Sequence, residues 1–413
     1  MNPPDTPMDV APNKEQRAEM KRSTHPRPHA KAVLPAAMVT LGLVLTACGQ
    51  DDPDPTAQET SAPATAKVQD PLVMTYDGGL SIIDSTTLKV VQNIPLEGFN
   101  RVNPAGNDRH VMVSTSTGFR VLDAAGAQLT KDEFTAPEPG HVVHHAGKTV
   151  LFSDGTGKVT TFDPRRLGDG LPEASNHTTQ HPHHGVAIEL TNGSLLVTLG
   201  TEEERTGAQI LDKNRKETAR NEECPGVHGE ATAKDEAVLI GCENGALLYK
   251  DGEFTKVKAP DEYGRIGNQA GHEESPIVLG DYKTDPDAEL ERPERVSLID
   301  TRTGDLKLVD LGTSYTFRSL GRGPHGEALV LGTDGALHVI DPERGEVTEK
   351  IKIMDKWREP LEWQQPRPTL HVRDHTAYVT DPDAKTLYAV DIESGEVKTK
   401  AQLPQTPNEL TST

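Results

Sequence analysis

The stretch VLFSDGTGKVTTFD, residues 150–163, contains the pattern that decides the fold. An apolar strand leads into a turn of Asp, Gly and Thr, and a second strand with apolar residues ends in Asp. The pattern recurs about every 43 residues, which is near the period of a four-stranded propeller blade. Eight copies can be read, at 73–84, 111–123, 150–163, 195–212, 237–251, 277–300, 328–341 and 377–391.

The repeats predict an all-β protein, a β-propeller with eight blades. Seven blades would result if one unit were irregular. A β-sandwich is the competing fold, but it does not need eight copies of one hairpin. The first unit has no strand ahead of its hairpin, so we expect the C-terminal segment 402–410 to supply that strand and close the ring.

Composition restricts the class of partner. Acidic residues outnumber basic ones, 64 to 43, and the formal net charge is -21. Nucleic-acid binding needs a positive surface, so we expect no nucleic-acid partner. Aromatic residues make up only 4% of the chain, which disfavours a pocket that stacks an organic cofactor.

The N-terminal region predicts export. Residues 32–47, AVLPAAMVTLGLVLTA, are apolar but shorter than the roughly 20 residues of a membrane-spanning helix. We therefore interpret 1–47 as a signal peptide. The run ends at Cys48, as in a bacterial lipobox, so we expect lipidation of Cys48 and anchoring to the outer face of the cell membrane. The alternative is an ordinary cleaved signal peptide. Residues 48–69 read as a flexible tether, and 70–413 as a single propeller domain.

Histidines concentrate where the first, channel-lining strands of three consecutive blades begin. Seven of the 16 histidines lie between residues 141 and 184. Pairing outward from the tight turns between first and second strands estimates the register. The expected turns are Gly147-Lys148, Asn192-Gly193 and Lys234-Asp235, which place His141 opposite Asp154, His184 opposite Thr201 and His228 opposite Gly241. All three histidines thus take one structural position.

Because neighbouring blades are adjacent, His141, His184 and His228 should meet at one mouth of the channel. Three imidazoles with a carboxylate or water as fourth ligand form a tetrahedral zinc set, and Asp154 is the nearest acidic candidate. The alternative is that each His is a channel-wall residue bonded to backbone carbonyls. Imidazoles alone do not separate zinc from copper or nickel.

Several other histidines are further candidates for metal ligands. If the register slips, substitutes lie close in sequence: His144, His145, His181 and His183. In the remaining blades the matching position holds arginine, at Arg101, Arg265, Arg318 or its neighbour Phe317, and Arg367, so the predicted site is one-sided. A second, weaker cluster is expected at the opposite end of the channel, from His272, His325 and His375, with His371 on the strand above. The histidine-rich run 176–184 is an equal candidate for a second metal.

Cys224 and Cys242 flank the hairpin that follows His228. Pairing about the Lys234-Asp235 turn brings them to neighbouring positions, and an exported protein favours a disulfide. The alternative is a thiolate zinc site of Cys224, Cys242 and His228, which a reducing compartment would permit.

These segments resemble the AztD family of bacterial zinc metallochaperones. The likeness covers most of the chain from about residue 70 and rests on HVVHHAGKTVLFSDG (141–155), HPHHGVA (181–187), ECPGVHGEA (223–231) with GCENG (241–245), and RPTLHV (367–372). It implies an extracytoplasmic propeller that binds zinc and passes it to the solute-binding protein of a zinc ABC transporter. The matching histidines are His141, His144, His145, His183, His184, His228 and His371. Some members carry a His-rich N-terminal stretch, but residues 49–72 contain no histidine.

The predicted function is therefore zinc delivery without enzymatic activity, by a monomer. The first alternative is a metal-dependent propeller enzyme, such as a lactonase or a quinone dehydrogenase. Such enzymes use several carboxylates and carbonyls around a hard cation, or stacking aromatics. The second alternative is a passive adhesion or assembly propeller on the cell surface, in which the histidines are incidental.

Overall fold

The computed structural model describes residues 68–413. The predicted signal peptide 1–47, the predicted lipidation site Cys48 and all but the last two residues of the predicted tether lie outside the described residues. At Val68, the first described residue, the side chain is buried and the N–H donates to the carbonyl of Ala125 at 2.9 Å. None of the helices within 68–413 is long and apolar enough to cross a membrane.

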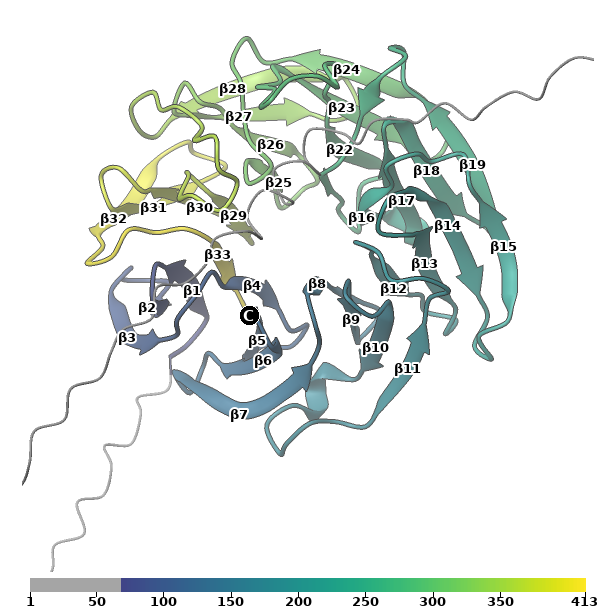
Figure 1. Ribbon diagram of the computed structural model, residues 1–413. Coiled ribbons are helices and arrows are strands. Elements are labelled where there is room, and N and C mark those ends of the chain that lie inside the picture. Colours follow the sequence, from purple (N-terminus) through teal and green to yellow (C-terminus); the bar gives the residue numbers. More distant parts are fainter. Residues whose placement is uncertain (1–67) are drawn as a thin grey trace, which may run out of the picture. The chain divides into compact units, whose positions relative to one another are not determined.

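Eight antiparallel sheets form the blades of a propeller, as predicted (Figure 1). The first four blades contain β33 (Leu410–Ser412), β1 (Pro71–Tyr76), β2 (Gly79–Asp84) and β3 (Val90–Pro95); β4 (Arg101–Pro104), β5 (His110–Ser114), β6 (Gly118–Asp123) and β7 (Gln128–Thr135); β8 (Pro139–His145), β9 (Lys148–Ser153), β10 (Lys158–Phe162) and β11 (Ala174–Thr178); and β12 (Ala187–Glu189), β13 (Leu195–Gly200), β14 (Arg205–Leu211) and β15 (Glu217–Asn221).

The other four blades follow the same inner-to-outer order. They contain β16 (His228–Ala233), β17 (Ala237–Cys242), β18 (Asn244–Lys250) and β19 (Glu253–Lys258), with β20 (Gly264–Arg265) beside β18; β21 (Gln269–Ala270), β22 (Ile277–Asp281), β23 (Arg295–Asp300) and β24 (Leu306–Asp310); β25 (Leu320–Arg322), β26 (Ala328–Leu331), β27 (Ala336–Asp341) and β28 (Glu346–Lys352); and β29 (Leu370–Arg373), β30 (Thr376–Asp381), β31 (Thr386–Asp391) and β32 (Val397–Gln402). Two short 3-10 helices are η1 (Pro164–Arg166) and η2 (Lys234–Glu236).

The C-terminus closes the ring. β33 pairs with β1, with Thr411 opposite Val73, so the first blade combines the two ends of the described chain. The sequence predicted this closure, but it placed the strand at 402–410, whereas β33 begins at Leu410. Glu409 anchors the closing segment because its carboxylate accepts from Arg101 Nε and Arg318 Nη2, both at 3.0 Å.

The core lies between adjacent blades. The second and third strands of each blade are almost wholly buried, whereas outer strands such as β3 alternate between exposed and half-buried residues. Between the fourth and fifth blades, for example, Leu196 and Ile210 pack with Val238 and Ile240. Each blade therefore buries the apolar face that its neighbour cannot cover alone.

Strand direction fixes two ends of the propeller. The inner strand of each blade begins at one end, which we call the entry end. In the seven blades after the first, the turn from the inner strand into the second strand lies at the other end, the turn end. Turns between second and third strands return to the entry end. Residues far apart in sequence but equivalent in the repeat therefore lie at the same end.

Candidate metal centre

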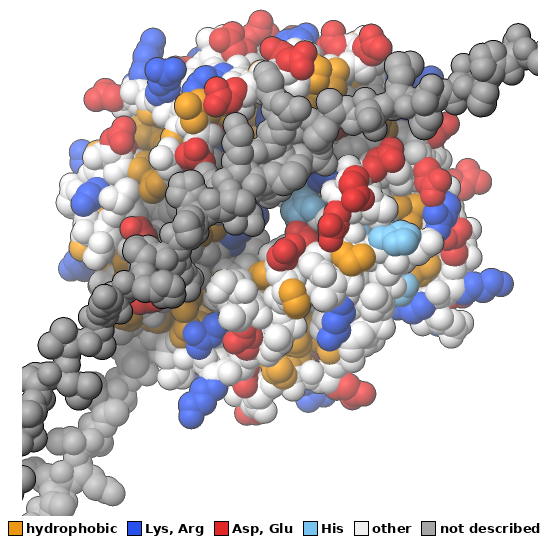
Figure 2. All heavy atoms as spheres, viewed as in Figure 1, with side chains coloured by type: hydrophobic (Ala, Val, Ile, Leu, Met, Phe, Trp, Pro, Cys, Tyr) orange, Lys and Arg blue, Asp and Glu red, His pale blue; other side chains and the backbone are white. Residues whose placement is uncertain are grey.

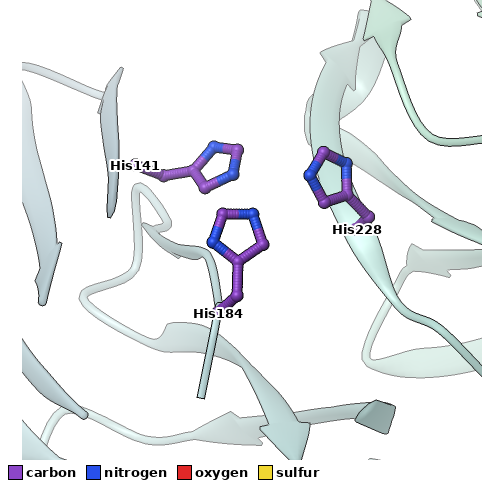
Figure 3. A group of neighbouring side chains, drawn as sticks. All are labelled: His141, His184 and His228. Atoms are coloured by element: carbon purple, nitrogen blue, oxygen red, sulfur yellow. The ribbon is translucent and has the colours of Figure 1, made fainter. Parts of the chain in front are cut away.

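Three imidazoles gather at the entry end, on the third, fourth and fifth blades (Figure 3). His141 lies on β8, His184 in the segment before β12, and His228 is the first residue of β16. Their ring centroids are 5.2 Å apart for His141 and His184, 5.0 Å for His184 and His228, and 5.5 Å for His141 and His228. One ring nitrogen from each lies within 4.8 Å of the other two.

The predicted register was wrong at His141 and His184. The turn after β8 is Ala146-Gly147, since His145 pairs with Lys148, and the ladder shifts between Pro139 and Val142. His141 lies within this irregularity and does not pair with Asp154.

In the fourth blade the predicted register is off by one residue. β12 pairs with β13 as Ala187 with Val197, and His184 precedes the ladder rather than facing Thr201. His184 therefore reaches the cluster from a loop.

The predicted pair of His228 with Gly241 does form. It forms for a different reason from the one used to predict it. The turn is one residue longer than expected, because the 3-10 helix Lys234–Glu236 occupies it. Gly229, with φ of 69°, sits in a register shift that restores the pairing. A left-handed φ favours glycine, because a Cβ there is strained.

Hydrogen bonds fix the orientation of two of the imidazoles. His184 Nδ1 lies 2.6 Å from Asp154 Oδ2, and His228 Nδ1 lies 2.5 Å from the Gly267 carbonyl oxygen. A carboxylate and a carbonyl only accept, so in both rings Nδ1 carries the proton and donates it. Nε2 therefore keeps its lone pair, which is the tautomer that metal-bound histidines adopt when a second group orients them.

Asp154 is placed beside the cluster by a close approach of two chain segments. A Cβ on residue 140 would lie 2.2 Å from Asp154 Oδ1, so Gly140 leaves room for the carboxylate. The same oxygen accepts weakly from the Gly185 N–H at 3.4 Å. Asp154, predicted as the nearest acidic ligand, is thus hydrogen-bonded to one of the three imidazoles.

Burial keeps two of the imidazoles uncharged. Burial lowers the pKa of His141 to about 3, and the nearby His184, Arg101 and Arg205 lower it further. Burial also holds the pKa of His228 well below its ordinary value, with contributions from His141 and His184. Both rings are therefore neutral at pH 7, as coordination of a cation requires.

Two of the other predicted histidines lie at the turn end. His145 Nε2 is 2.7 Å from Glu236 Oε1, so this ring joins the turns of the third and fifth blades. His144 is exposed, and its Cβ lies near Gly106, in the corresponding turn of the second blade. Neither residue belongs to the group at the entry end.

His183 and His371 are held by hydrogen bonds inside the fold. His183 is buried, with Nδ1 3.0 Å from the His181 carbonyl and Nε2 3.1 Å from Thr198 Oγ1. His371, on β29, has its Nε2 3.0 Å from Ser412 Oγ on the closing strand. Neither lies in the group at the entry end.

Cys224 and Cys242 form a disulfide, with their Cα atoms 4.9 Å apart. The bond joins the segment just before His228 to the end of β17. Since the two sulfurs are bonded to each other, the alternative site of two thiolates and His228 does not form. Both cysteines are fully buried, so the bond is shielded from solvent.

Arginines at the matching position of other blades are paired with acids. Arg101 and Arg318 share Glu409 at 3.0 Å each, and Arg367 Nη1 lies 2.7 Å from Glu359 Oε1. Guanidinium groups thus occupy the matching position in these blades.

Two carboxyl groups near histidines were missed by the sequence argument. Glu230 lies two residues after His228 on β16, and burial raises the pKa of its carboxyl to about 8. The His-x-Glu spacing on an inner strand was the available signal. Glu393 lies beside His325 and His375 at the turn end, in a group that does not include His272. Its 18-residue separation from His375 gave no local pattern to read.

No protein-family model matches the chain. Over 283 residues the chain is 26% identical to the zinc chaperone AztD of Citrobacter koseri, a match that spans 66% of this chain and 65% of that protein. The chain thus covers less than two thirds of this curated relative. The match confirms the resemblance to AztD that the sequence motifs indicated.

Solved structures agree on the fold. A structure of apo AztD from Citrobacter koseri and a crystal structure of the same protein each superpose with a TM-score of 0.72 at 21% identity, covering 84% of this chain and 98% of theirs. The dihydro-heme d1 dehydrogenase NirN superposes with a TM-score of 0.54 at 12% identity, covering 86% and 77%. These similarities support the eight-bladed propeller.

Proposed function

We propose that this chain is an extracytoplasmic zinc metallochaperone without enzymatic activity. The observation that carries the proposal is the group of His141, His184 and His228, whose ring nitrogens lie within 4.8 Å of one another. The sequence similarity to a protein named zinc chaperone AztD supports zinc as the cargo. The lactonase-like and adhesion alternatives gain no support from these comparisons.

Small side-chain movements would complete the site. Zinc binds imidazole nitrogen at about 2.0–2.1 Å, so three nitrogens in a tetrahedral shell lie about 3.3 Å apart. The present separations, within 4.8 Å, therefore need to shrink by at most about 1.5 Å, which rotation about side-chain bonds supplies. We assign Asp154 to orienting His184, and the fourth position to water or to a ligand from the acceptor.

The same three imidazole ligands would also allow zinc to be released. Neutral imidazoles exchange more readily than four thiolates, because each ring can leave separately and take up a proton. His184 is the most exposed of the three rings, so we expect it to be the first ligand that an acceptor replaces. The acceptor we propose is the solute-binding protein of a zinc ABC transporter.

Exposed acidic side chains lie in two loops at the entry end. Glu202, Glu203 and Glu204 are exposed in the turn after β13, and Glu222 and Glu223 are exposed just before β16. Figure 2 shows acidic side chains gathered near histidines on the viewed face. A negative surface raises the local concentration of cations, although salt confines the effect to about 8 Å.

We further propose that the signal peptide 1–47 is removed and that Cys48 is lipidated, so that a monomer is held on the outer face of the membrane by the 48–69 tether. The lipobox at Cys48 supports this anchoring. Mass spectrometry of the N-terminal peptide tests it directly. A mature chain that begins elsewhere, or an unmodified Cys48, would contradict the anchor without affecting the zinc assignment.

The central test is metal analysis of the purified protein beside a variant with His141, His184 and His228 all changed to Ala. We expect the variant to lose the most tightly bound equivalent of zinc. The matched control is His144→Ala, which removes an exposed histidine of the same inner strand and should leave that equivalent in place. If the triple variant keeps it, the site lies elsewhere.

A further inference from the structure

We propose that His325, His375 and Glu393 form a second, weaker zinc site at the turn end of the propeller. This inference goes beyond the proposed function and does not depend on it, because the three residues belong to the seventh and eighth blades. One ligand atom from each lies within 4.8 Å of the other two.

The carboxylate lies between the two rings. Glu393 Oε1 is 2.9 Å from His375 Nδ1 and 3.4 Å from His325 Nε2, and the two ring centroids are 5.8 Å apart. Two imidazole nitrogens and one carboxylate oxygen form one of the ligand sets that hold zinc with an open fourth position. The three side chains therefore provide the chemistry of a site that keeps water as its remaining ligand.

Hydrogen bonds hold the two turns of the eighth blade in place. His375 lies between β29 and β30, and Glu393 lies between β31 and β32. The His375 carbonyl accepts from the Ile392 N–H at 3.0 Å, and Ser394 N–H donates to Asp391 Oδ1 at 2.8 Å. The backbone positions of His375 and Glu393 are therefore fixed relative to each other.

The turn of the seventh blade is also closed by hydrogen bonds. His325 N–H donates to Glu327 Oε2 at 3.0 Å, and Gly326 N–H donates to the Gly323 carbonyl at 3.0 Å. His325 is thus presented from an ordered turn, and Glu327 places a second carboxylate close to its backbone. The negative charges of Glu327 and Glu393 together favour binding of a divalent cation.

The exposure of the three side chains determines how strongly we expect this second site to bind zinc. The side chains of His325, His375 and Glu393 are 65%, 53% and 58% exposed. Long, exposed side chains lose rotamer freedom when they bind, and water competes for the ion. We therefore expect this site to bind zinc more weakly than the group at the entry end, and to fill second.

The test is a zinc titration of the purified protein by calorimetry, with ZnCl2 as the only ligand. In a variant with His141, His184 and His228 changed to Ala, one weaker equivalent should remain. Adding Glu393→Gln should weaken that equivalent at least tenfold. The matched control is Glu396→Gln, since Glu396 is an exposed acid in the same turn, and it should leave the affinity unchanged.

The outcomes separate the two sites. Loss of the tight equivalent in the triple variant, together with at least tenfold weaker binding of the second equivalent in Glu393→Gln, supports both assignments. Equal affinity in Glu393→Gln and Glu396→Gln would mean that the three residues form only a surface ion pair. Should the triple variant fail to fold, the same comparison in the otherwise unchanged protein, read from the second phase of the titration, decides the question.

Discussion

Removal of the Asp154 carboxylate should weaken zinc binding although this group is not assigned as a ligand. Asp154 Oδ2 accepts from His184 Nδ1 at 2.6 Å, and it thereby fixes the tautomer that exposes Nε2. Loss of such an outer partner costs about 10–100-fold in metal affinity. The His184 side chain is 43% exposed, and solvent screens its hydrogen bond with Asp154. We therefore expect Asp154→Ala to weaken zinc binding about tenfold, the lower end of this range. A tenfold loss corresponds to about 1.4 kcal/mol.

The assay is competition for zinc against a fluorescent chelator, with thermal unfolding of the zinc-free protein to verify the fold. Asp154→Asn keeps an acceptor oxygen, so its loss of affinity should be smaller than that of Asp154→Ala. Asp169→Ala removes the same charge from an exposed position and should change the affinity less than threefold. If Asp154→Ala behaves like Asp169→Ala, the carboxylate does not orient His184, and the assignment of a preformed imidazole set is wrong.

Two further predictions concern the stability of the zinc-free protein. Changing Cys224 and Cys242 to Ala opens a disulfide that spans 18 residues, which should lower the free energy of unfolding by about 3 kcal/mol in a urea titration; a loss below about 1 kcal/mol would contradict a structural role. The pKa of His141 is about 3 in the folded state and about 6.5 in an unfolded chain. Between these values the unfolded chain binds the extra proton, so folded stability falls as pH drops through this window. His141→Ala should flatten this dependence in urea titrations from pH 4.5 to pH 7, and an unchanged slope would argue against a buried neutral ring.

Features that repeat could be predicted from the sequence. Eight copies of one hairpin pattern, each unable to bury both faces, were enough to predict the propeller and its closure by the C-terminus. The entry-end position of His141, His184 and His228 followed from counting back from turns, because equivalent residues of neighbouring blades lie close together. The Cys224–Cys242 pair followed from the same counting.

Irregular features could not be predicted in this way. The register shift beside His141 and the 3-10 turn before β17 each change the count by one residue, and no local pattern marks them. The contact of the Gly267 carbonyl with His228 joins residues of different blades. Glu393 was missed for a similar reason, because it reaches His325 from another blade.

The same irregularities would allow the proposed zinc site to release its metal although the propeller is rigid. His141 lies within a shift of its ladder, His184 precedes its strand, and His228 is separated from the regular part of β16 by Gly229. The three rings therefore lie at irregular positions of the inner strands, next to regular parts of the ladders. Movement of one ring away from zinc breaks no ladder hydrogen bond, and the energy barrier to release is then limited to the metal–nitrogen bond and to the contact of the ring with Asp154 or with the Gly267 carbonyl.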